Sequence, residues 1–144
     1  MATADFVSLH CRLTADNHRL IGRRELELMK PTAFFVNVAR GELVDQQALI
    51  DILSQWRIAG AALDVYEHEP VPAGDPLLAL DNVIVTPHWS ASTTDAFAAT
   101  SRAMSEGMRC AARGQVPENV VNCDVLEHRD FQAKLARFAE NARS

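Results

Sequence analysis

Four residues of the sequence could together bind an anionic carbonyl compound and move one proton. They are Arg40, Asp64, Glu69 and His88. Arginine is a permanent cation whose forked N–H donors match a carboxylate. Histidine titrates near neutral pH and can act as a general acid or base, and a carboxylate beside it can hold the ring in place. These residue types predict a candidate active site for carbonyl chemistry.

Each of these residues also has an ordinary structural explanation. Arg40 could be one partner of a surface ion pair, and Glu69, which precedes a proline, could be a solvated acid in a loop. His88 could be a turn residue bonded to backbone, and Asp64 could cap a loop. Residue type alone therefore leaves both explanations open, and the positions of the residues in the fold must decide between them.

The elements that carry these residues alternate between strand and helix. Asp45 is a good N-cap residue for a helix at residues 46–54. Pro31 follows and ends the expected helix at 20–29, and Gly114 ends the long expected helix at 93–113. Apolar segments of strand type occupy residues 5–9, 33–38, 60–65 and 82–87. Helices are expected at residues 20–29, 46–54 and 93–113, and around Phe131, Leu135 and Phe138.

This alternation predicts an α/β fold with a parallel sheet joined by right-handed crossovers. The strand at 33–38 is apolar apart from Asn37, which favours helices on both faces of the sheet. Ligands of open parallel sheets bind beyond the carboxyl ends of the strands. All four candidate residues follow strands at that edge, and their common position favours the chemical explanation.

Composition narrows the class of function. The 144 residues carry a net charge of −5, so no nucleic-acid partner is expected, and no apolar segment approaches the roughly 20 residues that cross a bilayer. The three cysteines are widely spaced, which suits a cytoplasmic location. The five histidines are scattered, and we expect no metal site.

Three segments of the sequence resemble consecutive signatures of the D-isomer-specific 2-hydroxyacid dehydrogenases. They are LELMKPTAFFVNVARGELVDQQALIDIL, GAALDVYEHEP and NVIVTPHWSAST, and the similarity extends from about residue 4 to residue 122. The family includes D-3-phosphoglycerate, hydroxypyruvate/glyoxylate and D-lactate dehydrogenases. The resemblance implies an oxidoreductase that reversibly transfers a hydride between a nicotinamide cofactor and a small 2-oxo or 2-hydroxy acid.

The resemblance also implies a role for each matching residue. Arg40 would bind the substrate carboxylate and polarise the carbonyl, His88 would be the acid/base, and Glu69 would pair with His88. Asp64 would hold the nicotinamide carboxamide. The positions implied to bind the cofactor, NAD with NADP not excluded, are Leu9, His10, Thr14, Val38, Ala39, Arg40, Asp64, His88 and Ala91.

One element of the family is missing from the sequence. No G-x-G-x-x-G motif occurs, and Gly22 is the only glycine before Gly41. The expected fold is therefore the second half of a Rossmann-type parallel sheet. Residues 1–122 would form the C-terminal half of a dinucleotide-binding domain, and residues 123–144 a helical tail returning to a substrate domain. We expect the chain alone to be inactive and to bind NAD weakly, because the pyrophosphate cradle is absent.

Two further expectations concern partners. A homo-oligomer is expected, because the unpaired edge or face that this chain would present invites self-association. The alternative to an enzyme is a non-catalytic module that has kept the NAD-domain fold and binds a partner through its sheet. The identity of the 2-hydroxy acid is not readable from these residues.

Overall fold

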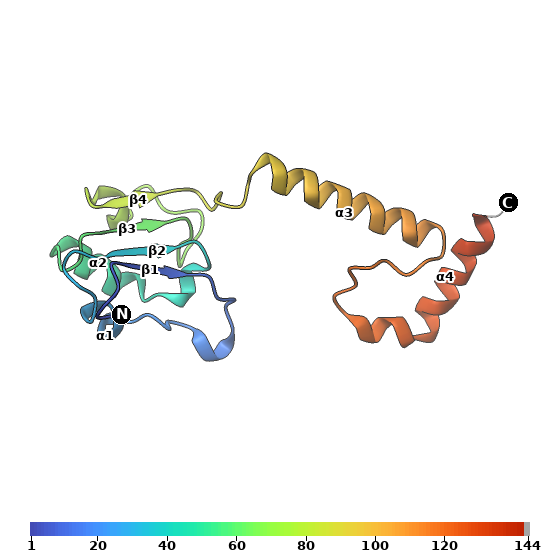
Figure 1. Ribbon diagram of the computed structural model, residues 1–144, viewed down its shortest axis with the longest axis horizontal. Coiled ribbons are helices and arrows are strands. Elements are labelled where there is room, and N and C mark those ends of the chain that lie inside the picture. The colour runs from blue at the N-terminus through green and yellow to red at the C-terminus, as the bar shows by residue number, and fades with distance from the viewer. Residues whose placement is uncertain (143–144) are drawn as a thin grey trace. The chain divides into compact units, whose positions relative to one another are not determined.

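The computed structural model describes residues 1–142 and divides the chain into two compact units (Figure 1). The first unit comprises Met1–Ala91, and the second begins at Ser92. The first unit contains the sheet and all four candidate residues. The expected boundary at residue 122 concerns the domains of a complete protein, and it stays a prediction.

The sheet of the first unit has four parallel strands in sequence order. They are β1 (Phe6–Leu9), β2 (Phe34–Asn37), β3 (Gly60–Leu63) and β4 (Val83–Val85). Leu9 pairs with Asn37, Asn37 with Leu63, and Leu63 with Val85, so the carboxyl ends of the strands are in register. The predicted parallel α/β fold is confirmed, and one edge of the sheet collects the residues that follow each strand.

Two helices connect the first three strands, α1 (Arg23–Glu27) and α2 (Gln46–Ser54). The Asp45 carboxylate caps α2 by accepting a hydrogen bond from the Ala48 amide at 3.0 Å, as predicted. Helix α1 is shorter than the expected 20–29. Its first predicted turn is extended instead, because Ile21 pairs with Val44 in an isolated parallel bridge and Gly22 is the N-cap.

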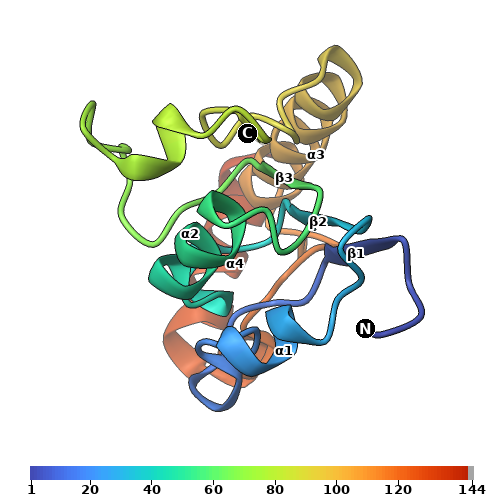
Figure 2. The ribbon, with the colours of Figure 1, turned by 90° about the vertical axis from the view of Figure 1, so that its left-hand side faces the viewer.

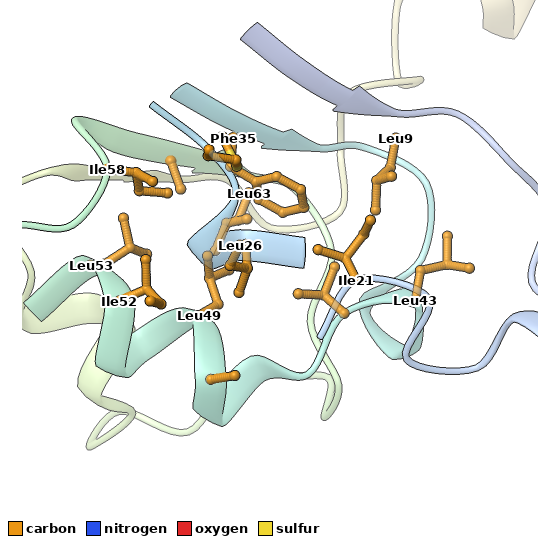
Figure 3. Packing of buried hydrophobic residues seen from close by; sticks show 14 of the residues in the cluster. Leu9, Ile21, Leu26, Phe35, Leu43, Leu49, Ile52, Leu53, Ile58 and Leu63 are labelled. Atoms are coloured by element: carbon orange, nitrogen blue, oxygen red, sulfur yellow. The ribbon is translucent and has the colours of Figure 1, made fainter. Parts of the chain in front are cut away.

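The core lies between one face of the sheet and these two helices (Figure 2). Leu49, Ile52 and Leu53 of α2 project toward Phe35 and the neighbouring strand residues (Figure 3). All four side chains are at most 2% exposed. Since fully burying such a side chain contributes about 1.5–3 kcal/mol, this layer stabilises the unit and holds its strand ends in place.

The opposite face of the sheet is not covered by helices of the first unit. Phe6 and Ile84 are 68% and 69% exposed, and the rings of Phe6 and Phe34 stack with their centroids 5.6 Å apart. The expectation of helices on both faces is therefore wrong for this unit. A continuous apolar strand indicates that both faces are apolar, but it does not say that the covering helices belong to the same 91 residues.

The second unit is a helical pair, α3 (Thr94–Ala112) and α4 (Arg129–Asn141). Gly114 follows α3 with a φ of +69°, the left-handed conformation that ends many helices. The buried Leu135 anchors α4. Short 3₁₀ turns occur at Ala15–Asn17, Gly41–Leu43, Pro76–Ala79 and Cys123–Glu127. None of the helices in residues 1–142 is long and apolar enough to span a membrane.

Candidate active site

The turn after β2 is built by the side chain of Asn37, which is 1% exposed. Its Oδ1 accepts a hydrogen bond from the Ala39 amide at 3.0 Å, and its Nδ2 donates to the Arg40 carbonyl at 2.9 Å. Both bonds fix the turn that places Arg40 just after the carboxyl end of β2. No role was predicted for Asn37, although one polar residue inside the apolar run FFVNV is a signal for such a contact.

The Arg40 side chain is exposed, and its Nη1 donates to the Ala39 carbonyl at 2.6 Å. Within residues 1–142 it forms no ion pair with a carboxylate. The surface ion pair considered as its ordinary explanation is therefore absent from the described residues. A guanidinium has five N–H donors, so most of them remain available for an anion that arrives from solvent.

Gly41 joins this turn to the segment after β3. A Cβ atom at residue 41 would lie 1.9 Å from the carbonyl carbon of Tyr66 and 2.5 Å from the amide nitrogen of Glu67. Among the described glycines, Gly41 is not one with a positive φ. Gly41 is therefore not required for a left-handed backbone conformation. The residue is glycine because the backbone of the Arg40 turn packs directly on the Tyr66–Glu67 peptide.

Glu69 and His88 form the predicted pair. His88 Nδ1 lies 2.8 Å from Glu69 Oε2, and Glu69 Oε1 accepts a hydrogen bond from the Tyr66 amide at 3.0 Å. Burial acts to raise the pKa of Glu69, but the bonds from His88 and Tyr66 outweigh it and the pKa lies below its ordinary value. The ionised carboxylate can only accept, so Nδ1 donates and Nε2 is free for proton transfer.

Asp64 follows β3 and is 2% exposed. Its carboxylate accepts hydrogen bonds from the Thr86 hydroxyl at 2.5 Å and from the amides of Trp89 and Ser90 at 2.8 and 2.9 Å. Burial acts to raise the pKa of Asp64, yet these bonds together hold it well below its ordinary value. Asp64 is thus a buried, ionised acceptor that binds the chain on both sides of His88.

A first prediction concerns acid stability. The folded pKa values of Asp64 and Glu69 lie below their unfolded values of about 4. Their stabilisation is therefore complete above that pH and is lost as the pH falls through the folded values. We expect the urea midpoint to change little between about pH 7 and pH 5 and to drop as the pH falls from about 5 toward 2, with a smaller drop in Asp64→Asn. Equal pH dependence in both proteins would contradict the assignment to Asp64.

The positions implied for the cofactor lie along the same unit but differ in exposure. The side chain of Leu9 belongs to the core, so only its backbone borders the carboxyl edge. His10 is exposed and contacts the Ser8 hydroxyl, and the Thr14 amide donates to Asn17. Val38 is 36% exposed at the end of β2. Ala39 lies in the adjoining turn, and Ala91 is exposed at the end of the first unit.

Glu69 and His88 line one cavity of about 590 Å³. Most of its other walls are apolar, and they include Tyr66, Val71 and Pro87. The Tyr66 hydroxyl contacts the carbonyls of Leu63 and Thr86 at 2.9 and 2.8 Å. Neither Tyr66 nor Thr86 was predicted as a site residue. Their only signal is that each lies next to a strand end, within two or three residues of a predicted catalytic residue.

The carboxyl edge of the sheet thus carries the bonded pair Glu69–His88, the buried carboxylate of Asp64 and the exposed guanidinium of Arg40. It can bind a carboxylate at Arg40 and hold a proton at His88 Nε2. Among residues 1–142, no group of histidine, cysteine and acidic side chains is arranged to hold a metal ion.

Comparison with known proteins gives the following similarities. Residues 1–90 match the family described as D-isomer specific 2-hydroxyacid dehydrogenase, NAD binding domain. The chain is 43% identical over 126 residues to a glyoxylate reductase of Korarchaeum cryptofilum, covering 88% of this chain and 38% of that protein. It is 49% identical over 119 residues to a D-3-phosphoglycerate dehydrogenase of Methanocaldococcus jannaschii, covering 83% of this chain and 22% of that protein.

The fold is also similar to that of solved structures. A D-lactate dehydrogenase with NAD⁺ from Lactobacillus jensenii aligns with a TM-score of 0.78 and 35% identity. The alignment covers 83% of this chain and 40% of that one. The chain therefore spans about two fifths or less of the length of these three proteins.

Proposed function

The chain belongs to the D-isomer specific 2-hydroxyacid dehydrogenase family, and from this premise we propose that it supplies the proton-transfer part of an active site that reversibly reduces a 2-oxo acid. The observation that carries the proposal is the 2.8 Å contact between Glu69 and His88 at the sheet edge where Arg40 is available. The substrate class is a small 2-oxo or 2-hydroxy acid. Which member of that class is used is left open.

Arg40 binds the substrate in this proposal. A guanidinium can hold a carboxylate through two parallel N–H···O bonds and can also polarise the adjacent carbonyl oxygen. Lysine offers a point charge without the fork. Because Arg40 is exposed and has no acid partner among the described residues, its charge is directed at a ligand rather than at the protein itself.

His88 moves the proton. Glu69 holds Nδ1–H, which orients the ring and stabilises the imidazolium when Nε2 is protonated. Nε2 then donates its proton to the carbonyl oxygen during reduction and takes it back from the hydroxyl during oxidation. General acid–base catalysis of this kind contributes typically about 10²–10⁴-fold to the rate.

NAD is the proposed cofactor, with NADP not excluded, and its nicotinamide supplies the hydride. The residues of this chain fit the nicotinamide end: Val38 offers an exposed apolar surface beside Arg40 at the carboxyl edge. They do not include a glycine-rich pyrophosphate cradle. We therefore expect NADH titrated into the purified chain to show no micromolar binding by fluorescence or calorimetry, and micromolar affinity would contradict this.

A chimera tests the catalytic proposal. This chain would replace the matching segment of the K. cryptofilum glyoxylate reductase, to which it is 43% identical. NADH-dependent reduction of glyoxylate is expected in the chimera. His88→Asn should lower kcat by about 10²–10⁴-fold. His128→Asn makes the same change at an exposed histidine of the second unit, and it should leave kcat unchanged.

A folded chimera that reduces no 2-oxo acid would contradict the proposal. Equal activity of the chimera and its His88→Asn variant would remove His88 from the mechanism.

A second candidate function is a binding module, and it is favoured by the exposed apolar sheet face with Phe6, Phe34 and Ile84. The same face suits the proposed homo-oligomer. Light scattering would measure the oligomeric state of the chain and of its Ile84→Lys variant. If the chain self-associates through this face, the charged variant should be monomeric. The described cysteines are all unpaired, which agrees with the proposed cytoplasmic location.

A further inference from the structure

Two residues at the end of β3 contact the segments that carry His88 and Glu69. Asp64 accepts hydrogen bonds from residues on either side of His88, namely the hydroxyl of Thr86 and the amides of Trp89 and Ser90. These donors lie 22 to 26 residues away in sequence. The Asp64 carboxylate is 2% exposed, so water cannot readily replace them.

The His88 backbone needs such support. Its φ is +53°, in the left-handed region that a residue with a side chain seldom adopts. A conformation of this kind persists only where the surrounding contacts over-determine it. The His88 amide adds a bond to the Thr86 carbonyl at 3.1 Å. Asp64 thus holds the two flanks of a strained turn in one geometry.

Tyr66 connects the same turn to Glu69. Its hydroxyl lies 2.8 Å from the Thr86 carbonyl, two residues before His88, and its amide donates to Glu69 Oε1 at 3.0 Å. The tyrosine is 5% exposed. One buried residue therefore contacts both the carboxylate of the pair and the chain that carries its imidazole.

We propose that Asp64 and Tyr66 form a positioning clamp that fixes the His88 ring against Glu69. The proposal deepens the proposed function and rests on it for its catalytic meaning. Neither residue needs to touch the substrate. The clamp determines where Nε2 points and which ring nitrogen carries the proton, because it fixes the distance between Nδ1 and the Glu69 carboxylate. The low pKa of Asp64 agrees with a carboxylate that stays ionised while the turn is formed.

The clamp can be tested on the full chain without any activity. In ¹⁵N-labelled protein, the ring nitrogen shifts of neutral His88 report the fraction in the Nδ1–H tautomer. Hydrogen exchange measures how strongly the Trp89 and Ser90 amides, which donate to Asp64, are protected from solvent. Asp64→Asn replaces one of the two carboxylate oxygens that accept from Thr86, Trp89 and Ser90. Tyr66→Phe removes the hydroxyl that contacts the Thr86 carbonyl, and Thr86→Val removes the hydroxyl that donates to Asp64. Thr86→Ser keeps the hydroxyl and serves as the rescue.

Asp75→Asn is the matched control for the aspartate. Asp75 also accepts two hydrogen bonds, from the Leu77 amide and from Gln46, but it does not contact the His88 turn. This variant should leave the His88 ring shifts as in the wild type.

We expect the wild-type ring to be mainly the Nδ1–H tautomer. Asp64→Asn should lower that fraction and speed exchange of the Trp89 and Ser90 amides by about tenfold or more. Thr86→Val and Tyr66→Phe should also lower the tautomer fraction, and Thr86→Ser should restore it. If Asp64→Asn does not fold, Thr86→Val compared with Thr86→Ser decides the question alone.

Unchanged His88 shifts in Thr86→Val and Tyr66→Phe would overturn the clamp, as would an equal change in Asp75→Asn. In the chimera, Tyr66→Phe should lower kcat more than it alters KM for glyoxylate, since Arg40 is untouched. An inactive wild-type chimera would count against the proposed function, whereas the ring shifts would still decide the clamp. The two failures are therefore distinguishable.

Discussion

Arg40→Ala should lower kcat/KM for reduction of a 2-oxo acid by on the order of 10³-fold in the chimera. In the proposed mechanism, this variant lacks both the cation that binds the carboxylate and the donor that polarises the carbonyl. Arg40→Lys keeps the charge but loses the planar fork, so it should recover only part of the loss. Steady-state kinetics with glyoxylate and NADH measure both effects.

Arg57→Ala is the control for a lost surface cation. Arg57 is exposed, follows α2 and lies outside the candidate site. Its replacement should leave kcat/KM within about twofold of the wild type, as expected for a surface change away from the site. Largely unchanged kcat/KM in Arg40→Ala would exclude Arg40 from substrate binding, and a full recovery in Arg40→Lys would exclude the bidentate geometry.

Gly41→Ala should destabilise the chain by about 3 kcal/mol or more. The new Cβ would lie 1.9 and 2.0 Å from the carbonyl carbon and oxygen of Tyr66. These are backbone atoms of the segment that also bonds Glu69, so no side-chain rotation can relieve the overlap. The turn that carries Arg40 and the loop that carries Glu69 would have to separate. Urea unfolding of the purified chain measures the change in the free energy of unfolding.

Gly74→Ala is the matched control, because a Cβ at residue 74 meets no atom within 4 Å. It should change the free energy of unfolding by no more than about 0.5–1 kcal/mol. Similar stability of the two variants would show that the close approach at Gly41 does not hold the two segments together. A destabilised Gly41→Ala chain should also exchange the Tyr66 amide faster, since that amide bonds Glu69 beside the overlap.

Local chemistry in the sequence was sufficient to predict the order of strands and helices and to select the candidate residues of the site. Apolar segments of strand length, the N-cap Asp45 and the glycine after α3 are each recognisable from a few neighbouring residues. Parallel strands place their carboxyl ends at one edge, so the common position of Arg40, Glu69 and His88 could be predicted as well.

The contacts that make this edge a site depend on the tertiary structure. Asp64 was expected to bind a cofactor, yet its carboxylate is buried against Thr86, Trp89 and Ser90. Such bonds depend on strand register and on the path of each loop, which residue spacing does not encode.

Gly41 shows the same limit, because a glycine needed for a close backbone approach looks in sequence like a glycine needed for a turn. The exposed sheet face around Phe6 and Ile84 is a second example, because the apolar strands did not reveal that helices of this unit leave that face uncovered. The amino-acid sequence by itself determined which residue types follow each strand end, and so which residues are candidates for the site. Only the tertiary structure decided what holds them, because hydrogen bonds and steric contacts form between segments that are distant along the chain.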